Sequence, residues 1–166
     1  MAKLIKRSQI RAFLNTSPNT PSVPVWGIVG NKQTTGDYNY DANTTDETYI
    51  VDDNATVTID SYKLTLPNEM KCYFGDGVYD FVNTLRRNLA TGTDAETQVL
   101  LIDTYDENNG SFFAQKYNCS ISVEKYGGDG GETPTISFTI NANGNPVNGT
   151  ATITQGVPTF TESASL

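Results

Sequence analysis

The sequence predicts a mainly β protein, an antiparallel β-sandwich or half-barrel with one flanking α-helix, an extended N-terminal arm and a long loop. Hydrophobic residues make up 37% of the 166 residues, which suffices for one packed domain with many loops. Thr, which favours strands, and Asn and Gly, which favour turns, are abundant. Apolar and polar residues alternate in several segments, whereas helical periodicity occurs in one. These observations together predict the fold class.

Residues 1–22 are predicted to form the extended arm, because the Asn-Thr-Ser-Pro-Asn-Thr-Pro of residues 15–21 cannot hold a regular helix or a central strand. The first eleven positions contain no acid and four of the chain's eleven basic residues, Lys3, Lys6, Arg7 and Arg11. A short basic segment of this kind suits either nucleic acid or an acidic neighbouring subunit.

The domain itself is expected to span residues 23–155 and to begin with a strand at 23–29. Residues 31–47 follow without a periodic apolar face, so they are predicted to be a long loop, of the kind that is usually functional or disordered. A short strand is expected at 48–51. Alternation then resumes, with a change of phase near Ser61 that indicates a β-bulge or two strands. The alternating apolar residues are Val57, Ile59, Tyr62, Leu64 and Leu66.

One segment, residues 76–91, has the pattern of an amphipathic helix. Asp76 suits the N-cap, Arg86 and Arg87 suit the C-terminal turn, and Gly92 suits a stop. Its apolar residues recur at helical spacing and form one stripe, which predicts that the helix lies on a sheet. The stripe consists of Val78, Phe81, Val82, Leu85 and Leu89.

The second half of the chain is expected to be antiparallel strands. Residues 99–102 are apolar without alternation, which predicts a strand covered on both faces. Asn109-Gly110 is typical of a hairpin turn, and residues 117–124 and 135–142 alternate strictly. Turns at Asn143-Gly144 and Asn148-Gly149 should precede a last strand at 150–154. Residues 156–166 are predicted to be a flexible C-terminal tail.

The residue types give little support for catalysis. The chain has no histidine, and its glycine-rich segment at 127–131 lacks the Lys-Ser/Thr of a phosphate-binding loop. The acidic segment 103–110 does not have the calcium-loop spacing, and a carboxylate pair without clustered tryptophans is weak support for a glycosidase. We therefore predict no enzyme, cofactor or metal, and expect Cys72 and Cys119 to be free thiols.

Charge and hydropathy restrict the partners. The body beyond residue 11 holds 19 acidic and seven basic residues, so it should repel a phosphate backbone. No apolar run approaches the length of a membrane span, and none follows the basic start as a signal peptide would require. We therefore expect no membrane contact and no tight binding of nucleic acid.

Four stretches, taken in order, resemble the major tail tube proteins of long-tailed phages, particularly those that infect Gram-positive bacteria. They are Val-Trp-Gly-Ile-Val-Gly at 25–30; Gly-Asp-Gly-Val-Tyr-Asp-Phe-Val at 75–82, followed by Leu85-Arg86-Arg87, Gly92 and Ala95-Glu96-Thr97; Tyr-Gly-Gly-Asp-Gly-Gly-Glu at 126–132; and Ile140-Asn141 with Gly-Asn-Pro-Val-Asn-Gly-Thr at 144–150. Their order and spacing, more than any single stretch, carry the resemblance, which spans most of residues 25–150.

The resemblance implies a structural subunit that self-assembles into stacked hexameric rings around an acidic channel for DNA. It implies as partners further copies of the chain, a tape measure protein, and tail terminator and baseplate proteins. The place of action would be the virion tail, after assembly in the host cytoplasm. The alternative is a carbohydrate- or protein-binding β-sandwich module of the receptor-binding or adhesin type, which the tyrosines near residues 38–40 would suit.

Two sets of site residues follow from the assembly hypothesis. Opposite charges on the arm and the long loop predict a ring-to-ring contact. Its residues are Lys3, Lys6, Arg7, Arg11, Asp37, Tyr38, Tyr40, Asp41, Asp46 and Glu47. Polar faces of two alternating strands should line the channel, because their apolar neighbours must face the core. The channel-lining residues are Asn118, Ser120, Ser122, Glu124, Thr135, Ser137 and Thr139.

Overall fold

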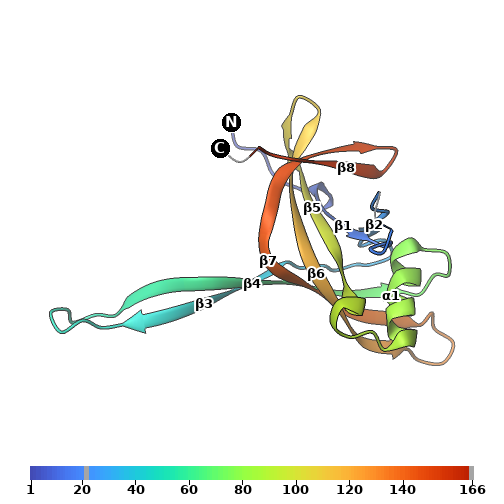
Figure 1. The fold of residues 1–166 in the computed structure, drawn as a ribbon, viewed down its shortest axis with the longest axis horizontal. Coiled ribbons are helices and arrows are strands. Elements are labelled where there is room, and N and C mark those ends of the chain that lie inside the picture. The colour runs from blue at the N-terminus through green and yellow to red at the C-terminus, as the bar shows by residue number, and fades with distance from the viewer. Residues whose placement is uncertain (21–22, 165–166) are drawn as a thin grey trace.

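The computed structural model describes residues 1–20 and 23–164 and shows an antiparallel eight-stranded sheet with one α-helix against it (Figure 1). The mainly β fold class with one flanking helix, predicted from the sequence, is confirmed. In chain order the elements are η1 (Arg7–Gln9), β1 (Ile10–Asn15), β2 (Trp26–Val29), β3 (Asn39–Glu47), β4 (Thr56–Lys71), α1 (Gly77–Asn88), η2 (Gly92–Ala95), β5 (Glu96–Asn108), β6 (Ser111–Gly127), β7 (Thr135–Thr154) and β8 (Val157–Glu162).

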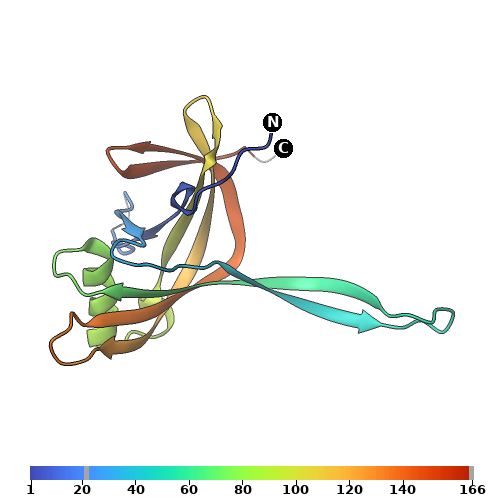
Figure 2. The same ribbon diagram turned by 180° about the vertical axis from the view of Figure 1, so that it is seen from behind.

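The long strands β6 and β7 pair along most of their lengths and form the spine of the sheet. The strand order is β2-β1-β5-β6-β7-β4-β3, and β8 lies off this path beside β7. The first half of β7 pairs with β4 and its second half with β8, so both strands share one edge of β7. The sheet curls strongly along this spine, as the two opposite views in Figures 1 and 2 show.

Helix α1 begins as its sequence predicts, but it ends at Asn88, before the predicted stop at Gly92. The Asp76 carboxylate accepts hydrogen bonds from the backbone N–H groups of Val78 and Tyr79, both at 3.1 Å, which satisfies donors that the first turn leaves unpaired. Leu89, at φ 47°, ends the helix in the left-handed conformation. The helix buries Val78, Val82 and Leu85 against the sheet, and Phe81 packs there in part. The predicted stripe is wrong at Leu89, which lies beyond the last helical residue and is 82% exposed.

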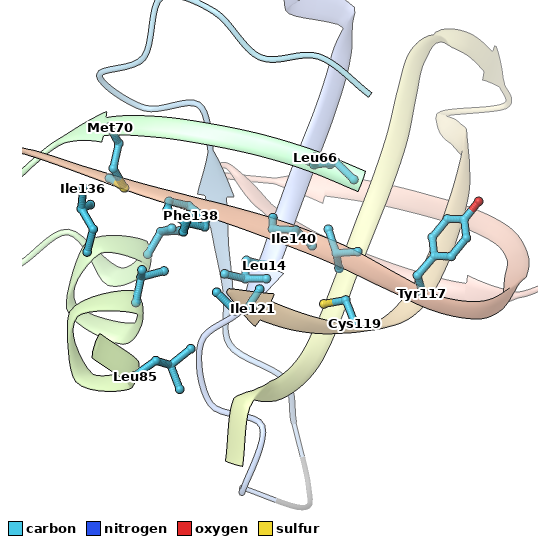
Figure 3. Packing of buried hydrophobic residues seen from close by; sticks show 14 of the residues in the cluster. Leu14, Leu66, Met70, Leu85, Tyr117, Cys119, Ile121, Ile136, Phe138 and Ile140 are labelled. Atoms are coloured by element: carbon cyan, nitrogen blue, oxygen red, sulfur yellow. The ribbon is translucent and has the colours of Figure 1, made fainter. Parts of the chain in front are cut away.

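Two apolar clusters cover the two faces of β1 and β5. The larger lies between the curled sheet and α1, where side chains from several strands converge (Figure 3). Its labelled members include Leu14, Leu66, Ile121, Phe138 and Ile140. The smaller, on the opposite face, contains Phe13, Leu100, Ile102, Ala114 and Ala151, with Phe160 packed against it. Residues 99–102 are therefore apolar without alternation because both faces are buried, as predicted.

The predicted arm is wrong for residues 10–15. These residues form β1, which lies between β2 and β5, and Phe13 and Leu14 are 1% and 0% exposed. The apolar run in β1 outweighs the basic residues before it and the prolines after it, because burial of two large side chains stabilises the strand in the sheet. Residues 21–22 of the predicted arm lie outside the described residues.

The predicted C-terminal tail is wrong for residues 157–162, which form β8. Gln155 and Gly156, at φ 50° and 80°, make the two-residue turn that joins β7 to β8. Phe160 then packs against the smaller cluster. Residues 165–166 of the predicted tail lie outside the described residues.

Two turns predicted within residues 143–149 are also wrong, because β7 runs through both positions as one strand. The pairing of β7 with β6 shifts between Lys116 and Asn118, where residues 144–146 of β7 lie opposite Tyr117 alone, so that β7 has two extra residues. Gly144, at φ 71°, lies in this bulge, so the Asn-Gly pair bends the strand without reversing it. The Asn109-Gly110 turn, at φ 51° and 80°, does reverse the chain between β5 and β6, as predicted.

Leu85→Ala should lower the free energy of unfolding by about 2–4 kcal/mol, because it leaves a cavity between α1 and the sheet. The matched control is Leu89→Ala at the end of the same helix, where the side chain is 82% exposed and the loss should stay within about 0.5 kcal/mol. Urea unfolding followed by circular dichroism measures both. Equal losses for the two variants would contradict the packing of the helix on the sheet.

Candidate functional site

Strands β3 and β4 form a hairpin that projects far from the body of the domain (Figures 1 and 2). They pair from Asn39 with Thr65 out to Glu47 with Thr56, a nine-residue strand that spans roughly 30 Å. The prediction of an unpatterned loop over 31–47 is therefore wrong for residues 39–47. The predicted strand at 48–51 is wrong as well, because these residues lie in the turn at the end of the hairpin.

A β-bulge keeps the hairpin in phase with the core. Asn43 pairs with Ser61 and Thr44 pairs with Ile59, so Asp60 is an extra residue on β4. The phase change that the sequence shows near Ser61 is confirmed as this bulge. Because of the extra residue, Val57 and Ile59 lie on the same face of the ribbon as Tyr62 and the buried Leu64.

The hairpin consequently has one apolar face that is open to solvent. The side chains of Val57, Ile59 and Tyr62 are 60%, 55% and 63% exposed. Tyr40 and Ala42, which pair with Leu64 and Tyr62, lie on the same face. We call these five residues the apolar ribbon face; the polar Thr44 and Asp46, which pair with Ile59 and Val57, lie beside them. This face continues the core face of β4 beyond the point where the core ends.

The far end of the hairpin, residues 48–55, is exposed throughout and is called the hairpin tip. It carries the adjacent apolar residues Ile50 and Val51, both largely exposed, followed by Asp52 and Asp53. The hairpin and its tip hold most of the chain's excess negative charge, because only Lys63 opposes six acids. These acids are Asp41, Asp46, Glu47, Asp52, Asp53 and Asp60.

The predicted channel-lining residues lie together on one sheet face, opposite the core. Ser122 pairs with Thr139 and Ser120 with Asn141 across β6 and β7, while Thr139 and Ser137 face Pro67 and Glu69 of β4. We call this surface the polar sheet face. Side-chain hydrogen bonds cross it from strand to strand. They join Gln98 to Asn118, Asn143 to Ser120, Asn141 to Ser122, Thr139 to Glu124 and Ser137 to Glu69; Thr135, at its end, donates to the Gly127 carbonyl.

The polar sheet face is mainly uncharged. Its carboxylates are Glu69, Glu96 and Glu124, and it also carries Lys71 and Lys125, which pair with Thr135 and Ser137. The amide and hydroxyl groups of Asn, Gln, Ser and Thr make up most of the remainder. The acidic character of the chain is therefore concentrated on the hairpin and only weakly expressed on this face.

A groove of about 600 Å³ lies at the base of the hairpin, between η1, the end of β2 and residues 30–38. Arg7 is fixed in its wall by hydrogen bonds to the carbonyl oxygens of Gly36, at 2.8 and 3.3 Å, and Ile10, at 2.6 Å. Its guanidinium carbon lies 5.6 Å from the centre of the Tyr38 ring. Arg11 and Asp37 also line the groove, so two cations face one carboxylate there. We call it the basic groove.

The basic groove encloses polar groups that lack partners. Among the described residues, both amide atoms of Gln33 and the hydroxyl of Tyr38 are buried without a hydrogen bond. Burial raises the pKa of the Tyr38 hydroxyl to about 12, against the opposing effect of Arg7. Nearby, burial raises the pKa of Asp103, while the hydrogen bond from Tyr105 lowers it. Unpaired buried groups of this kind each cost about 1–3 kcal/mol.

The predicted interface residues divide between two places. Arg7, Arg11, Asp37 and Tyr38 meet at the basic groove, while Tyr40, Asp41, Asp46 and Glu47 lie along β3. Lys3 and Lys6 are exposed before η1. The apolar ribbon face could not be located from the sequence, because the alternation of Val57 and Ile59 is the same whether their side chains meet a core or solvent. The acids of the tip, Asp52 and Asp53, were not among the predicted interface residues either.

Within the described ranges, 1–20 and 23–164, no group of three or more potential metal ligands comes together. In the same part of the chain no helix has the length and hydropathy of a membrane span. Both cysteines, Cys72 and Cys119, are free thiols, as predicted.

Comparison with known proteins adds no assignment. No protein family model matches the chain, and no curated protein is significantly similar to it.

Proposed function

We propose that the protein is a structural subunit that assembles with copies of itself into a tube, as the resemblance to phage tail tube proteins implies. The observation that carries the proposal is the apolar ribbon face. A two-stranded hairpin is marginally stable alone in water, and an exposed apolar face joined to free strand edges is typical of an interaction surface. Copies of one chain in a closed ring or stack can cover such a face.

In the proposed tube, the polar sheet face lines the channel. It is continuous across β5, β6, β7 and β4, and it lies opposite the face that α1 covers. Its uncharged groups give phosphates little to bind strongly, so DNA could pass without adhering. The other proposed partners are the tape measure, tail terminator and baseplate proteins that such a tube requires, and the proposed location is the virion tail.

Removal of residues 43–61 should abolish assembly and leave the body folded. Ala42 pairs with Tyr62, so an Asn-Gly turn can join the two strands there without changing their register. The circular dichroism spectrum should stay that of a folded β protein. Negative-stain electron microscopy of the concentrated parent should show rings or tubes that the variant lacks. A parent that stays dispersed and binds glycans would instead support the alternative binding module.

The double variant Val57→Thr, Ile59→Thr should raise the protein concentration required for assembly at least about tenfold. Both side chains are already exposed in the single chain, so its unfolding free energy should change by no more than about 0.5 kcal/mol. The control is Thr56→Ser, Thr58→Ser on the opposite face of the same strand. Sedimentation velocity measures assembly, and equal behaviour of the two double variants would contradict a role for the apolar ribbon face.

Glu124→Lys should leave assembly intact but make the channel retain DNA, because a cation on the lining binds phosphates. The variant is assembled with short duplex DNA and then sedimented, and Glu124→Gln serves as the neutral control. DNA held by the lysine variant should be released by salt and protected from nuclease. Nuclease-sensitive DNA would place the polar sheet face on the outside of the assembly.

A further inference from the structure

We propose that the basic groove is the receptor for the acidic hairpin tip of a second copy of this chain. The inference rests on the proposed function and deepens it, because it names the two surfaces that meet in each repeat of the assembly. The tip supplies Asp52 and Asp53, and the groove supplies the guanidinium groups of Arg7 and Arg11.

Charge complementarity identifies the occupant. Arg7 is held in a fixed orientation by three hydrogen bonds to backbone carbonyl oxygens, none of which neutralises its charge. Among the described residues, the side chain of Arg11 makes its hydrogen bond through Nε, to the Ser8 carbonyl oxygen at 3.2 Å, which leaves its terminal nitrogens for a carboxylate. The hairpin tip is the exposed segment of this chain that places two adjacent aspartates at the end of a projecting hairpin.

The unpaired groups in the groove suit a peptide segment. The side-chain amide of Gln33 offers one donor group and one acceptor, which can pair with a free backbone C=O and N–H of the tip. The Tyr38 hydroxyl offers a further donor. Since these atoms are closed from solvent in the single chain, residues 30–38 must open slightly to reach a partner. The bonds then formed would offset the cost of leaving the three atoms unpaired.

The arrangement of the two surfaces requires a second copy. The groove lies at the base of the hairpin, and the tip lies at its far end, away from the body in both views (Figures 1 and 2). A tip cannot reach the groove of its own chain across a paired ribbon of roughly 30 Å. Tip to groove is thus a head-to-tail contact between different patches, the kind that repeats into rings or filaments.

The test is charge reversal in the full-length chain. Arg11→Glu alone, and Asp52→Lys with Asp53→Lys, should each raise the concentration required for assembly at least about tenfold, because like charges then meet at every contact. The triple variant with all three substitutions should restore assembly to within about threefold of the parent. Arg11 is chosen over Arg7 because Arg7 also holds residues 30–38 in place.

The control variants, Arg87→Glu and Asp129→Lys, reverse exposed charges away from both surfaces and should assemble like the parent. If the parent assembles and Arg11→Glu assembles equally well, the groove is not the receptor, although the proposed function stands. Failure of the triple variant to recover would also overturn the contact. A parent that never assembles would overturn the proposed function and this inference together.

A disulfide provides the second measurement. On a Cys72→Ser background, chains with Thr35→Cys at the groove and chains with Asp52→Cys at the tip are mixed and oxidised. A dimer of the two chains should form in the mixture, and it should be at least about tenfold less abundant when Asp129→Cys replaces Asp52→Cys. Equal yields from the two mixtures would show random collision and overturn the contact.

Discussion

The architecture depends on strand β4, because one half of it lies in the packed sheet and the other half lies in the projecting hairpin. Strand β4 runs for 16 residues, Thr56–Lys71; its second half, from Thr65 onward, pairs with β7 and places Leu66 and Met70 in the core, while its first half has only β3 beside it. Side chains alternate between faces with a period of two, and the bulge at Asp60 takes up the extra residue between Ile59 and Tyr62, so that the apolar side chains stay on one face. The face that is core at one end of β4 is therefore an exposed apolar surface at the other.

In the proposed assembly, the apolar ribbon face would supply most of the binding free energy, and the charged groups would mainly align neighbouring copies. Covering the apolar ribbon face removes hydrocarbon from water, which gives a favourable free energy of about 25 cal/mol per Å². The charges of the tip and the groove contribute less, because exposed ion pairs are weak and screened by salt. These charges would mainly select the orientation of a neighbouring copy, since they favour one placement over others.

The sequence predicts those elements whose pattern is local. Asp76 and the stripe through Leu85 determine α1, and alternation determines much of β6 and the first part of β7, so these segments follow from the sequence. Strand β3 could not be predicted, because Asn39–Glu47 is polar on one face and mixed on the other, and it is a strand only because β4 lies beside it. The groove was beyond prediction for a similar reason: η1, the end of β2 and residues 30–38 meet only in the folded chain.

The positions of the charged residues affect how strongly the proposed channel lining would bind DNA. A strongly acidic lining would repel DNA, but it would also set like charges against each other around a ring. Here the hairpin carries six acids against Lys63 alone, while amide donors of the polar sheet face are already engaged: the Asn141 amide bonds to Ser122 and the Thr139 carbonyl, and the Asn143 amide bonds to Ser120. A lining whose hydrogen-bond donors satisfy one another offers few to a passing phosphate. Under the proposed function, weak adhesion would follow from internal hydrogen bonding more than from repulsion.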